Sequence, residues 1–404
     1  MTLIRIPITN YYGGGDYTAP VYVGSRQAQA NVILDTGSST LAVKQSVYNP
    51  LSDTNFTPTV FAQDITYGTG GWAGPVVTTS LSMGLPGNTA AIGDGTLALT
   101  VEQEPDNFGL ADGILGLAYD TLNDAYSLGD YLKQKNVTPA VTWPWPLAIR
   151  NTQSAIEQFE RFIEAMPHEN VTPYFTQLVK QNVVANKFAF YTRRSTPKGN
   201  DPADPENHGV FVLGGGEEET DLFQGEFLNV DVVHDVYYNT NLKAVRVGDA
   251  AAVTVRALPQ QFVSSMVSNS IIDSGTNSLA LADDAFQAIM GSLGSINPEL
   301  GQIALQATQA QNSGGGIPTS LVKPENWPNI TFIMTGEKGE DVPLVCSPRT
   351  YWQLDAFDVG TATFQIDSMG EVQSILGLPL FNNYYTVFDR SADVSGVVKF
   401  APIK

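Results

Sequence analysis

Residues 32–43 read VILDTGSSTLAV, and a second stretch, residues 270–281, reads SIIDSGTNSLAL. In each stretch an Asp preceded by two apolar residues is followed by Thr or Ser, then Gly, then another hydroxyl residue, and the stretch ends in Leu-Ala and an aliphatic residue. Each is followed along the chain by a related phrase, GILGLAY at 113–119 and SILGLPL at 374–380. The matching order predicts duplication of one unit, giving two lobes related by an approximate two-fold axis.

The composition favours a β-rich fold. A chain of 404 residues is too long for one ordinary core, so two lobes are expected. The 37 Gly, 24 Pro and only 15% charged residues favour strands over a helical bundle. We therefore predict an all-β protein with few short helices, divided into an N-terminal β lobe (residues 1–185) and a C-terminal β lobe (186–404).

Local patterns agree with that class. Alternating, β-branched segments predict strands at 19–24, 209–215, 330–336, 384–390 and 396–403. Apolar residues at helical spacing predict three helices, at 154–166, 173–181 and 282–293. The polar, proline-containing stretch 196–209 predicts an exposed loop.

The net charge of −20 argues against nucleic acid and anionic membranes as partners, since both would repel the chain. Solubility explains such a charge. A protein that works in acid, where many of its 41 carboxylates are neutral, is a second explanation. No run of 18 apolar residues occurs, so no membrane span is predicted.

The single cysteine, Cys346, excludes an intramolecular disulfide and fits a reducing compartment. Its neighbours in VPLVCSPRT include no His or Cys, which favours a buried structural thiol. The N-terminus lacks the apolar core of a signal peptide. We expect a cytoplasmic protein, with a secreted protein trimmed to its mature domain as the alternative.

The two aspartates suit acid–base catalysis. Asp35 and Asp273 each follow a strand-like apolar pair, and Gly37 and Gly275 permit a tight turn after them. Two carboxylates within hydrogen-bonding reach share one proton. A water between them then meets a base on one side, while an acid protonates the substrate carbonyl and afterwards the departing nitrogen. This arrangement suits peptide-bond hydrolysis without metal, organic cofactor or covalent intermediate.

The neighbouring hydroxyl residues have expected roles. Thr36 and Ser274 are placed to link the two turns across the axis. Ser38 and Thr276 are placed to donate to the outer carboxylate oxygens. One copy of Asp-hydroxyl-Gly by itself is equally well an ordinary β-turn; the pair in matching context favours the catalytic interpretation.

These motifs resemble the pepsin-like aspartic proteases (peptidase family A1). The resemblance rests on DTGSS at 35–39, ITYGTG at 65–70, DGILGLAY at 112–119, VTPYFTQLVKQNVV at 171–184, DSGT at 273–276 and ILGLPLFNNYYTVFDR at 375–390. It runs from about Tyr17 to the C-terminus, apart from roughly 121–170 and the loop near 196–209. It implies a bilobal fold with a central cleft for extended polypeptides, the catalytic pair Asp35 and Asp273, and a monomer.

The resemblance also implies substrate-binding residues. Residues 65–74 would form a flap, a hairpin lid with Tyr67 near its tip, and the backbone of Gly68 and Thr69 would bind substrate. Ile33 and Ile114 match positions that line an apolar pocket beside the scissile bond, which implies a preference for bulky hydrophobic side chains.

The chain also departs from that family. Ala42 stands where a Trp commonly holds the flap tyrosine, and Trp72 within the flap is a candidate for part of that packing. The chain lacks disulfides, and the strand-like LIRIPI at 3–8 leaves no room for a pro-segment. Both features resemble the small bacterial, shewasin-like branch; a recombinant mature domain is the competing explanation.

Other functional classes fit less well. Gly68, Gly70 and Ala73 match a dinucleotide-binding fingerprint, but no helix pattern follows. The three histidines are scattered, which argues against a His-based zinc site. A glycosidase would need two carboxylates but neither the repeated phrase nor a flap. The more serious alternative is a pepsin-fold protein that binds peptides with weak or no activity, and Ala42 is the feature in its favour.

Overall fold

The computed structural model describes residues 2–67, 70–103, 108–147, 153–199, 201–356, 358–392 and 394–404. The chain forms two compact units, one of Met1–Ile4 and Thr18–Ala185, the other of Arg5–Tyr17 and Asn186–Lys404. The break after residue 185 is where the sequence placed it. Residues 5–17 were expected in the N-terminal lobe but belong to the second unit, because β1 (Ile4–Gly13) is hydrogen-bonded to β13 (His208–Leu213).

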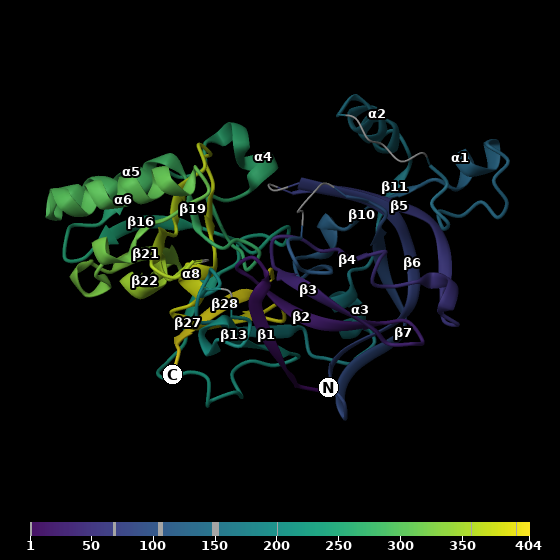
Figure 1. The fold of residues 1–404 in the computed structure, drawn as a ribbon, viewed down its shortest axis with the longest axis horizontal. Helices are drawn as coiled ribbons and strands as arrows, with labels where there is room; N and C mark the ends of the chain where they lie inside the picture. The colour runs from purple at the N-terminus through teal and green to yellow at the C-terminus, as the bar shows by residue number, and fades with distance from the viewer. Residues whose placement is uncertain are drawn as a thin grey trace. The chain divides into compact units, whose positions relative to one another are not determined.

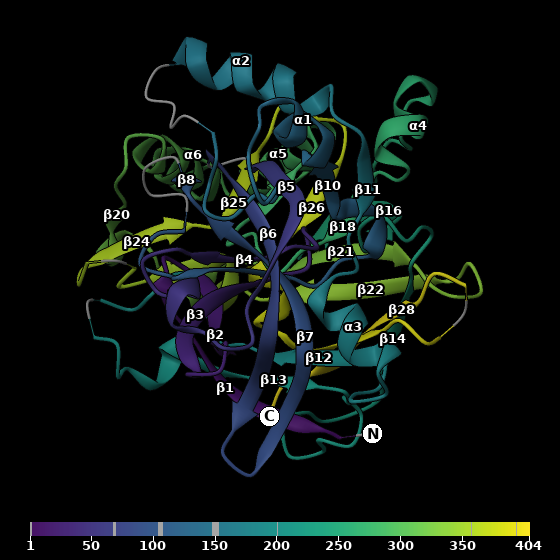
Figure 2. The same ribbon diagram turned by 90° about the vertical axis from the view of Figure 1, so that its right-hand side faces the viewer.

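The first unit is built on a closed barrel. Around the barrel, each strand is hydrogen-bonded to the next in the order β2 (Asp16–Val23), β3 (Ala28–Asp35), β9 (Gly113–Gly116), β4 (Leu41–Lys44), β7 (Asn88–Thr100) and β6 (Gly70–Leu85). Figure 2 shows the long neighbouring strands β6 and β7. The far end of β6, Leu81–Met83, pairs with Val21–Val23 of β2 and closes the ring. Closure leaves no unpaired edge among these six strands.

A hairpin extends from the barrel. β5 (Thr57–Tyr67) pairs antiparallel with the first part of β6, and β8 (Glu102–Gln103) pairs with β6 as well. On the other edge of β5 lie β10 (Asp124–Ser127) and β11 (His168–Asn170). The helix predicted at 173–181 is present as α3 (Tyr174–Lys180), which lies against β7. Pro173 is its N-cap rather than its first residue.

The insertion covers the outer face of this hairpin (Figure 1). It contains α1 (Gly129–Gln134) and α2 (Gln153–Glu164), the second being the helix predicted at 154–166. Its buried side chains form one cluster with two hairpin residues: Ala62, Ala73, Leu128, Leu132, Phe159 and Ile163. Phe162 and Met166 of the predicted apolar face pack against this cluster, and the side chain of Ile156 lies outside the described residues.

The second unit contains several sheets. The largest has the order β1, β13, β12 (Lys187–Tyr191), β27 (Tyr384–Asp389), β28 (Val397–Pro402) and β14 (Leu228–Asp231). Its core is aromatic: the rings of Phe188 and Phe388 stack with centroids 5.0 Å apart. All five segments predicted as strands from alternation are strands, so the mostly-β class is confirmed.

Three smaller sheets complete this unit. One has the order β15 (Asn239–Thr240), β18 (Ser270–Ile272), β26 (Ser374–Leu376), β19 (Leu279–Leu281) and β25 (Ile366–Ser368). The second has the order β17 (Val253–Thr254), β16 (Leu242–Val247), β21 (Ile330–Thr335) and β22 (Asp341–Cys346). The third is β20 (Ile317–Pro318), β24 (Thr361–Phe364) and β23 (Trp352–Leu354).

Two long helices lie side by side in the second unit, α5 (Asp283–Ile296) and α6 (Pro298–Gln311) (Figure 1). The sequence predicted α5 but not α6. Asn297 caps α6 by accepting a hydrogen bond from the Glu299 amide, with Pro298 at the first helical position. Single-turn helices are α4 (Val263–Met266), α7 (Pro348–Tyr351) and α8 (Leu378–Phe381).

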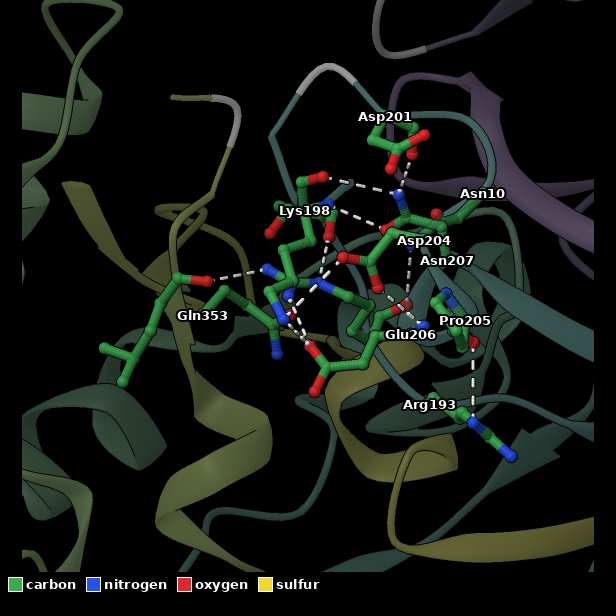
Figure 3. A network of polar contacts seen from close by, with 12 residues as sticks. Asn10, Arg193, Lys198, Asp201, Asp204, Pro205, Glu206, Asn207 and Gln353 are labelled. Atoms are coloured by element: carbon green, nitrogen blue, oxygen red, sulfur yellow. Dashed lines mark hydrogen bonds and ion pairs between the residues drawn. The ribbon is translucent and has the colours of Figure 1, made fainter. Parts of the chain in front are cut away.

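The loop at 196–209 is less exposed than predicted. Figure 3 shows its polar network, in which Glu206 accepts ion pairs from Arg194 (3.1 Å) and Lys198 (3.3 Å). Asn207 is fully buried, and its Oδ1 accepts a 2.7 Å hydrogen bond from the Lys198 amide. The prediction of an exposed loop holds at residues 201–203, 205, 206 and 208 and is wrong at Thr196, Pro197 and Asn207, which are buried. The Asn207 side chain can be buried because it satisfies backbone groups of the loop itself.

Two further sequence expectations concern Cys346 and membrane spans. Cys346 is fully buried, and burial raises the pKa of its thiol to about 12, so it is the inert structural thiol that was predicted. No helix in the described part of the chain is long and apolar enough to cross a membrane.

Candidate active site

Asp35 stands at the end of β3 in the first unit. Its side chain is 6% exposed, and Asp35 Oδ1 accepts a 2.7 Å hydrogen bond from the Gly37 amide. β3 runs parallel to β9, with Ile33 opposite Ile114 and Asp35 opposite Gly116. The Leu117 amide donates to the Asp35 carbonyl at 2.7 Å. These bonds fix both the backbone and the carboxylate of Asp35.

Asp273 has the same setting in the second unit, directly after β18. It is 6% exposed, and its Oδ1 accepts a 2.9 Å hydrogen bond from the Gly275 amide. β18 runs parallel to β26, and the Asp273 amide donates to the Leu376 carbonyl at 3.2 Å. Asp273 Oδ2 accepts a 2.6 Å hydrogen bond from Thr276 Oγ1.

The duplication read from the sequence is also a duplication of topology. In the first unit β9 lies between β3, to which it is parallel, and β4, to which it is antiparallel. In the second unit β26 lies in the same way between β18 and β19. The registers repeat too. Ile33, Ile114 and Ala42 lie opposite one another in one unit, and Ile271, Ile375 and Ala280 do so in the other.

The glycine of each Ile-Leu-Gly phrase lies directly against an Asp turn. A Cβ atom on Gly116 would be 2.3 Å from the Ser39 backbone nitrogen. A Cβ atom on Gly377 would be 2.2 Å from the Thr276 carbonyl oxygen. No side chain fits at either position, so the second phrase of the repeat is required by close backbone packing onto the first.

The hydroxyl residues differ between the two turns. Thr276 makes the contact expected of it, whereas Ser38 Oγ, although buried, has no hydrogen-bond partner among the described residues. The donation predicted for Ser38 is thus absent, and a physical reason is that β-branched Thr is stiff at χ1 while Ser is not. Thr36 and Ser274 are both buried, and the link predicted between them stays a prediction.

A buried polar network, not anticipated from the sequence, supports the Asp35 turn. Ser39 Oγ donates to the Tyr119 carbonyl at 2.5 Å, and Thr40 Oγ1 donates to Asn123 Oδ1 at 2.7 Å. Gln63, from β5 of the hairpin, donates to the same Asn123 oxygen at 2.8 Å. Gln63 follows buried Ala62 in a strand whose burial does not alternate, so the sequence carried no signal for this contact.

The hairpin predicted as a flap is present in part. Ile65 lies opposite Trp72, and Tyr67 lies opposite Gly70, so β5 and β6 remain paired as far as these two residues. Gly68, Thr69 and the side chain of Tyr67 lie outside the described residues, so their roles stay predictions.

The apolar pocket residues come together in the first unit. Ile33 and Ile114, each 6% exposed, belong to one buried cluster, whose members are Ile33, Ala42, Trp72, Ala98, Phe108, Ala111 and Ile114. Trp72 is 2% exposed and shares this cluster with Ala42. Trp72 therefore packs beside Ala42, and its packing against the flap tyrosine stays a prediction.

A carboxyl group near the Asp273 turn was not anticipated. Asp367 lies opposite Ala280 in the parallel pair of β25 and β19, and burial raises its pKa although Ser278 donates a hydrogen bond to it. Asp367 and Asn277, the residue after Thr276, both line a cavity of about 390 Å³. Across the described residues no three His, Cys, Asp or Glu side chains gather in a way that could hold a metal ion.

Comparisons with known proteins agree with the geometry. The sequence profile described as eukaryotic aspartyl protease matches residues 16–140 and 162–401. Pepsin-3 of Oryctolagus cuniculus is 23% identical over an alignment of 402 residues that covers 96% of this chain and 81% of that protein. Pepsin A of Sus scrofa is 25% identical (98% and 84% covered), and chymosin of Camelus dromedarius is 24% identical (98% and 83%). The internal residues without a match, 141–161, lie within the insertion expected near 121–170, so the resemblance breaks over a shorter segment than predicted. The loop near 196–209, which was predicted to depart from the family, lies within the matched residues.

Proposed function

We propose that this chain, which belongs to the eukaryotic aspartyl protease family, is an aspartic endopeptidase whose catalytic pair is Asp35 and Asp273. The observation that carries the proposal is the repeated setting of these two residues. Each is a buried carboxylate at the end of a strand, with one oxygen held by the amide of a glycine two residues later. Each strand is also locked by a parallel Ile-Leu-Gly strand.

The proposed reaction uses one shared proton. When the two carboxyl groups face a common water, one is ionised and the other protonated. The ionised group takes a proton from the water, whose oxygen adds to the peptide carbonyl carbon, and the protonated group gives its proton to the carbonyl oxygen. Collapse of this intermediate breaks the C–N bond, and the departing nitrogen takes a proton from the carboxyl group that received one from the water. One hydroxyl group of the intermediate returns its proton to the other carboxylate as the new carboxyl group forms, so the pair again shares one proton.

The residues around the pair support three finer proposals. The need for one protonated carboxyl group gives an acidic pH optimum. The cluster with Ile33 and Ile114 gives a preference for bulky hydrophobic side chains beside the scissile bond. A hydroxyl group that replaces the attacking water gives inhibition by pepstatin and related transition-state mimics.

The test is digestion of a peptide library between pH 3 and 7, with and without pepstatin. The wild type should cleave in acid and be inhibited, while Asp35→Asn and Asp273→Asn should fold but lose cleavage. Asp130→Asn is the matched control, because Asp130 is exposed and pairs only with Lys133 among the residues described. Full activity in either dyad variant would remove the mechanism.

The alternative is a peptide-binding protein with weak or no activity. Ala42 favours it, because this position lies beside Ile114 in the cluster and carries no large side chain toward the hairpin. The same library separates the two functions: a binding protein retains peptides at pH 3–7 without releasing shorter products.

Three further proposals rest on the sequence alone. A monomer, a cytoplasmic location and membership of the shewasin-like branch follow from the expectations stated above, in particular from the single cysteine. Sedimentation of the purified chain and cell fractionation test the first two, and a phylogeny tests the third.

A further inference from the structure

A row of small and large residues crosses four barrel strands of the first unit. The registers place Ala98 of β7 opposite Ala42 of β4, Ala42 opposite Ile114 of β9, and Ile114 opposite Ile33 of β3. Directly opposed residues of neighbouring strands point to the same face. The face therefore has two isoleucines on one side and a hollow over two alanines on the other.

Trp72 belongs to the cluster that covers this row. It comes from β6, the return strand of the hairpin, and Ile65, its partner across the hairpin, packs against the same cluster. Phe108 and Ala111 complete the cluster from the segment before β9. Trp72 and Phe108 are the two large aromatic side chains of this cluster, whose remaining buried members are isoleucines and three alanines. Of the two rings, Trp72 is the one that the hairpin brings to the hollow beside Ile33 and Ile114.

The orientation of Trp72 is fixed by its neighbour. Ala73, the next residue along β6, belongs to the other cluster, in which the insertion packs on the outer face of the hairpin. Successive residues of a strand point to opposite faces. Covering the Ala73 face with Phe159 and Ile163 therefore holds Trp72 toward Ile33 and Ile114.

We propose that Trp72 is a specificity-determining residue that limits the size of the substrate side chain received beside Ile33 and Ile114. The inference rests on the proposed endopeptidase function. The ring occupies volume that a large aromatic side chain would need, so the pocket takes unbranched or γ-branched aliphatic side chains, Leu and Met, in preference to Phe and Trp.

The test compares matched peptides that differ only at the residue on the N-terminal side of the scissile bond, with Leu, Met, Phe or Trp there. The readout is the ratio of kcat/KM for Phe to that for Leu. This ratio does not depend on the fraction of folded enzyme. The wild type should favour Leu. Trp72→Leu should raise the Phe-to-Leu ratio about tenfold or more, since one methylene in an apolar pocket is worth roughly 10–200-fold.

Three variants keep the test decisive. Trp72→Phe, which removes less volume, should give an intermediate ratio. Adding Ala42→Leu to Trp72→Leu refills the hollow from β4 and should restore the wild-type ratio. Trp145→Leu, in the insertion and packed against the other cluster, is the matched control, which should lower stability without moving the ratio.

An unchanged ratio in Trp72→Leu, or an equal change in Trp145→Leu, would overturn the inference and leave the endopeptidase proposal standing. Absence of any cleavage by the wild type would instead overturn the proposed function.

Discussion

Replacing Gly116 by Ala should damage both stability and catalysis through a single methyl group. The added Cβ would lie 2.3 Å from the Ser39 nitrogen and 2.4 Å from the Ser39 Cα, where ordinary contacts begin at 3.4 Å. These are backbone atoms, which cannot rotate aside, so β9 and the Asp35 turn must separate by about 1 Å.

The magnitude follows from what the separation breaks. The Gly116 amide donates to the Thr40 carbonyl at 2.9 Å, and the Ala118 amide donates to the Ser38 carbonyl at 2.8 Å. Two strained or lost hydrogen bonds cost about 1 kcal/mol each, and overpacking costs about 1–3 kcal/mol. We expect the free energy of unfolding to fall by about 4 kcal/mol, which leaves a protein of ordinary stability mostly folded.

The catalytic effect should exceed the folding effect. A displacement of about 1 Å at a reacting group costs about 100-fold in rate. The assay is urea unfolding followed by kcat measurement, with active sites titrated by a tight-binding inhibitor, so that the loss per folded molecule is measured. Gly377→Ala, which meets the Thr276 carbonyl at 2.2 Å, should behave alike.

The matched control, Gly291→Ala, should change the free energy of unfolding in the opposite direction. Gly291 lies within α5, and a Cβ there would meet no atom within 4 Å. Gly291→Ala should therefore stabilise the protein by about 0.5–1 kcal/mol without changing kcat. Gly116→Ala within 1 kcal/mol of the wild type, and with kcat within about threefold, would refute the close-packing argument.

Three other changes have defined outcomes. Burial alone would raise the pKa of Asp53, but hydrogen bonds from Thr79, Tyr48 and two backbone amides lower it. Asp53→Asn should therefore lower the free energy of unfolding by about 1–2 kcal/mol at pH 6. In urea unfolding this difference from the wild type should shrink from pH 4 toward pH 2, and a constant difference would contradict the reasoning. Burial raises the pKa of Asp367, so the wild type loses stability as the pH rises above the pKa of Asp in the unfolded chain, near 4. Asp367→Asn should be more stable than the wild type at pH 7 and equally stable at pH 3. Equal stability of the two proteins at both pH values would show that ionising Asp367 does not cost stability. Phe159→Ala should lower the stability of the insertion by about 3 kcal/mol or more. Limited proteolysis should then cut faster near α2. An unchanged rate of cutting would show that the insertion does not depend on this cluster.

The sequence could predict elements whose pattern is strong and local. Segments such as 384–390 alternate and are β-branched or aromatic, and the structure has β27 there. Helix α2 carries large apolar residues at helical spacing, whereas α6 buries Leu300, Ala304 and Ala307. A stripe made mostly of alanine differs little in hydropathy from its surroundings, so α6 gave no clear periodic signal.

Contacts between distant segments could not be predicted in this way. The barrel closes because Leu81–Met83 of β6 pairs with Val21–Val23 of β2, and nothing in either segment specifies the other. Gln63 reaches Asn123 across 60 residues for the same reason. The two Asp phrases were recognisable because the chain carries them twice, and the repeat predicted a strand and a tight turn in each unit but not the parallel strand beside it.

The repeat explains what the two units share, and departures from it indicate where they differ in chemistry. The row Ile33, Ile114, Ala42 continues to Ala98 in the first unit, while the row Ile271, Ile375, Ala280 continues to Asp367 in the second. One row therefore ends in a cluster that contains an indole ring, and the other ends at a half-buried carboxyl group that lines a cavity. Because the two strand frameworks are alike, we expect these end residues, rather than the shared isoleucines, to distinguish what each unit accepts from a substrate if the proposed endopeptidase function holds.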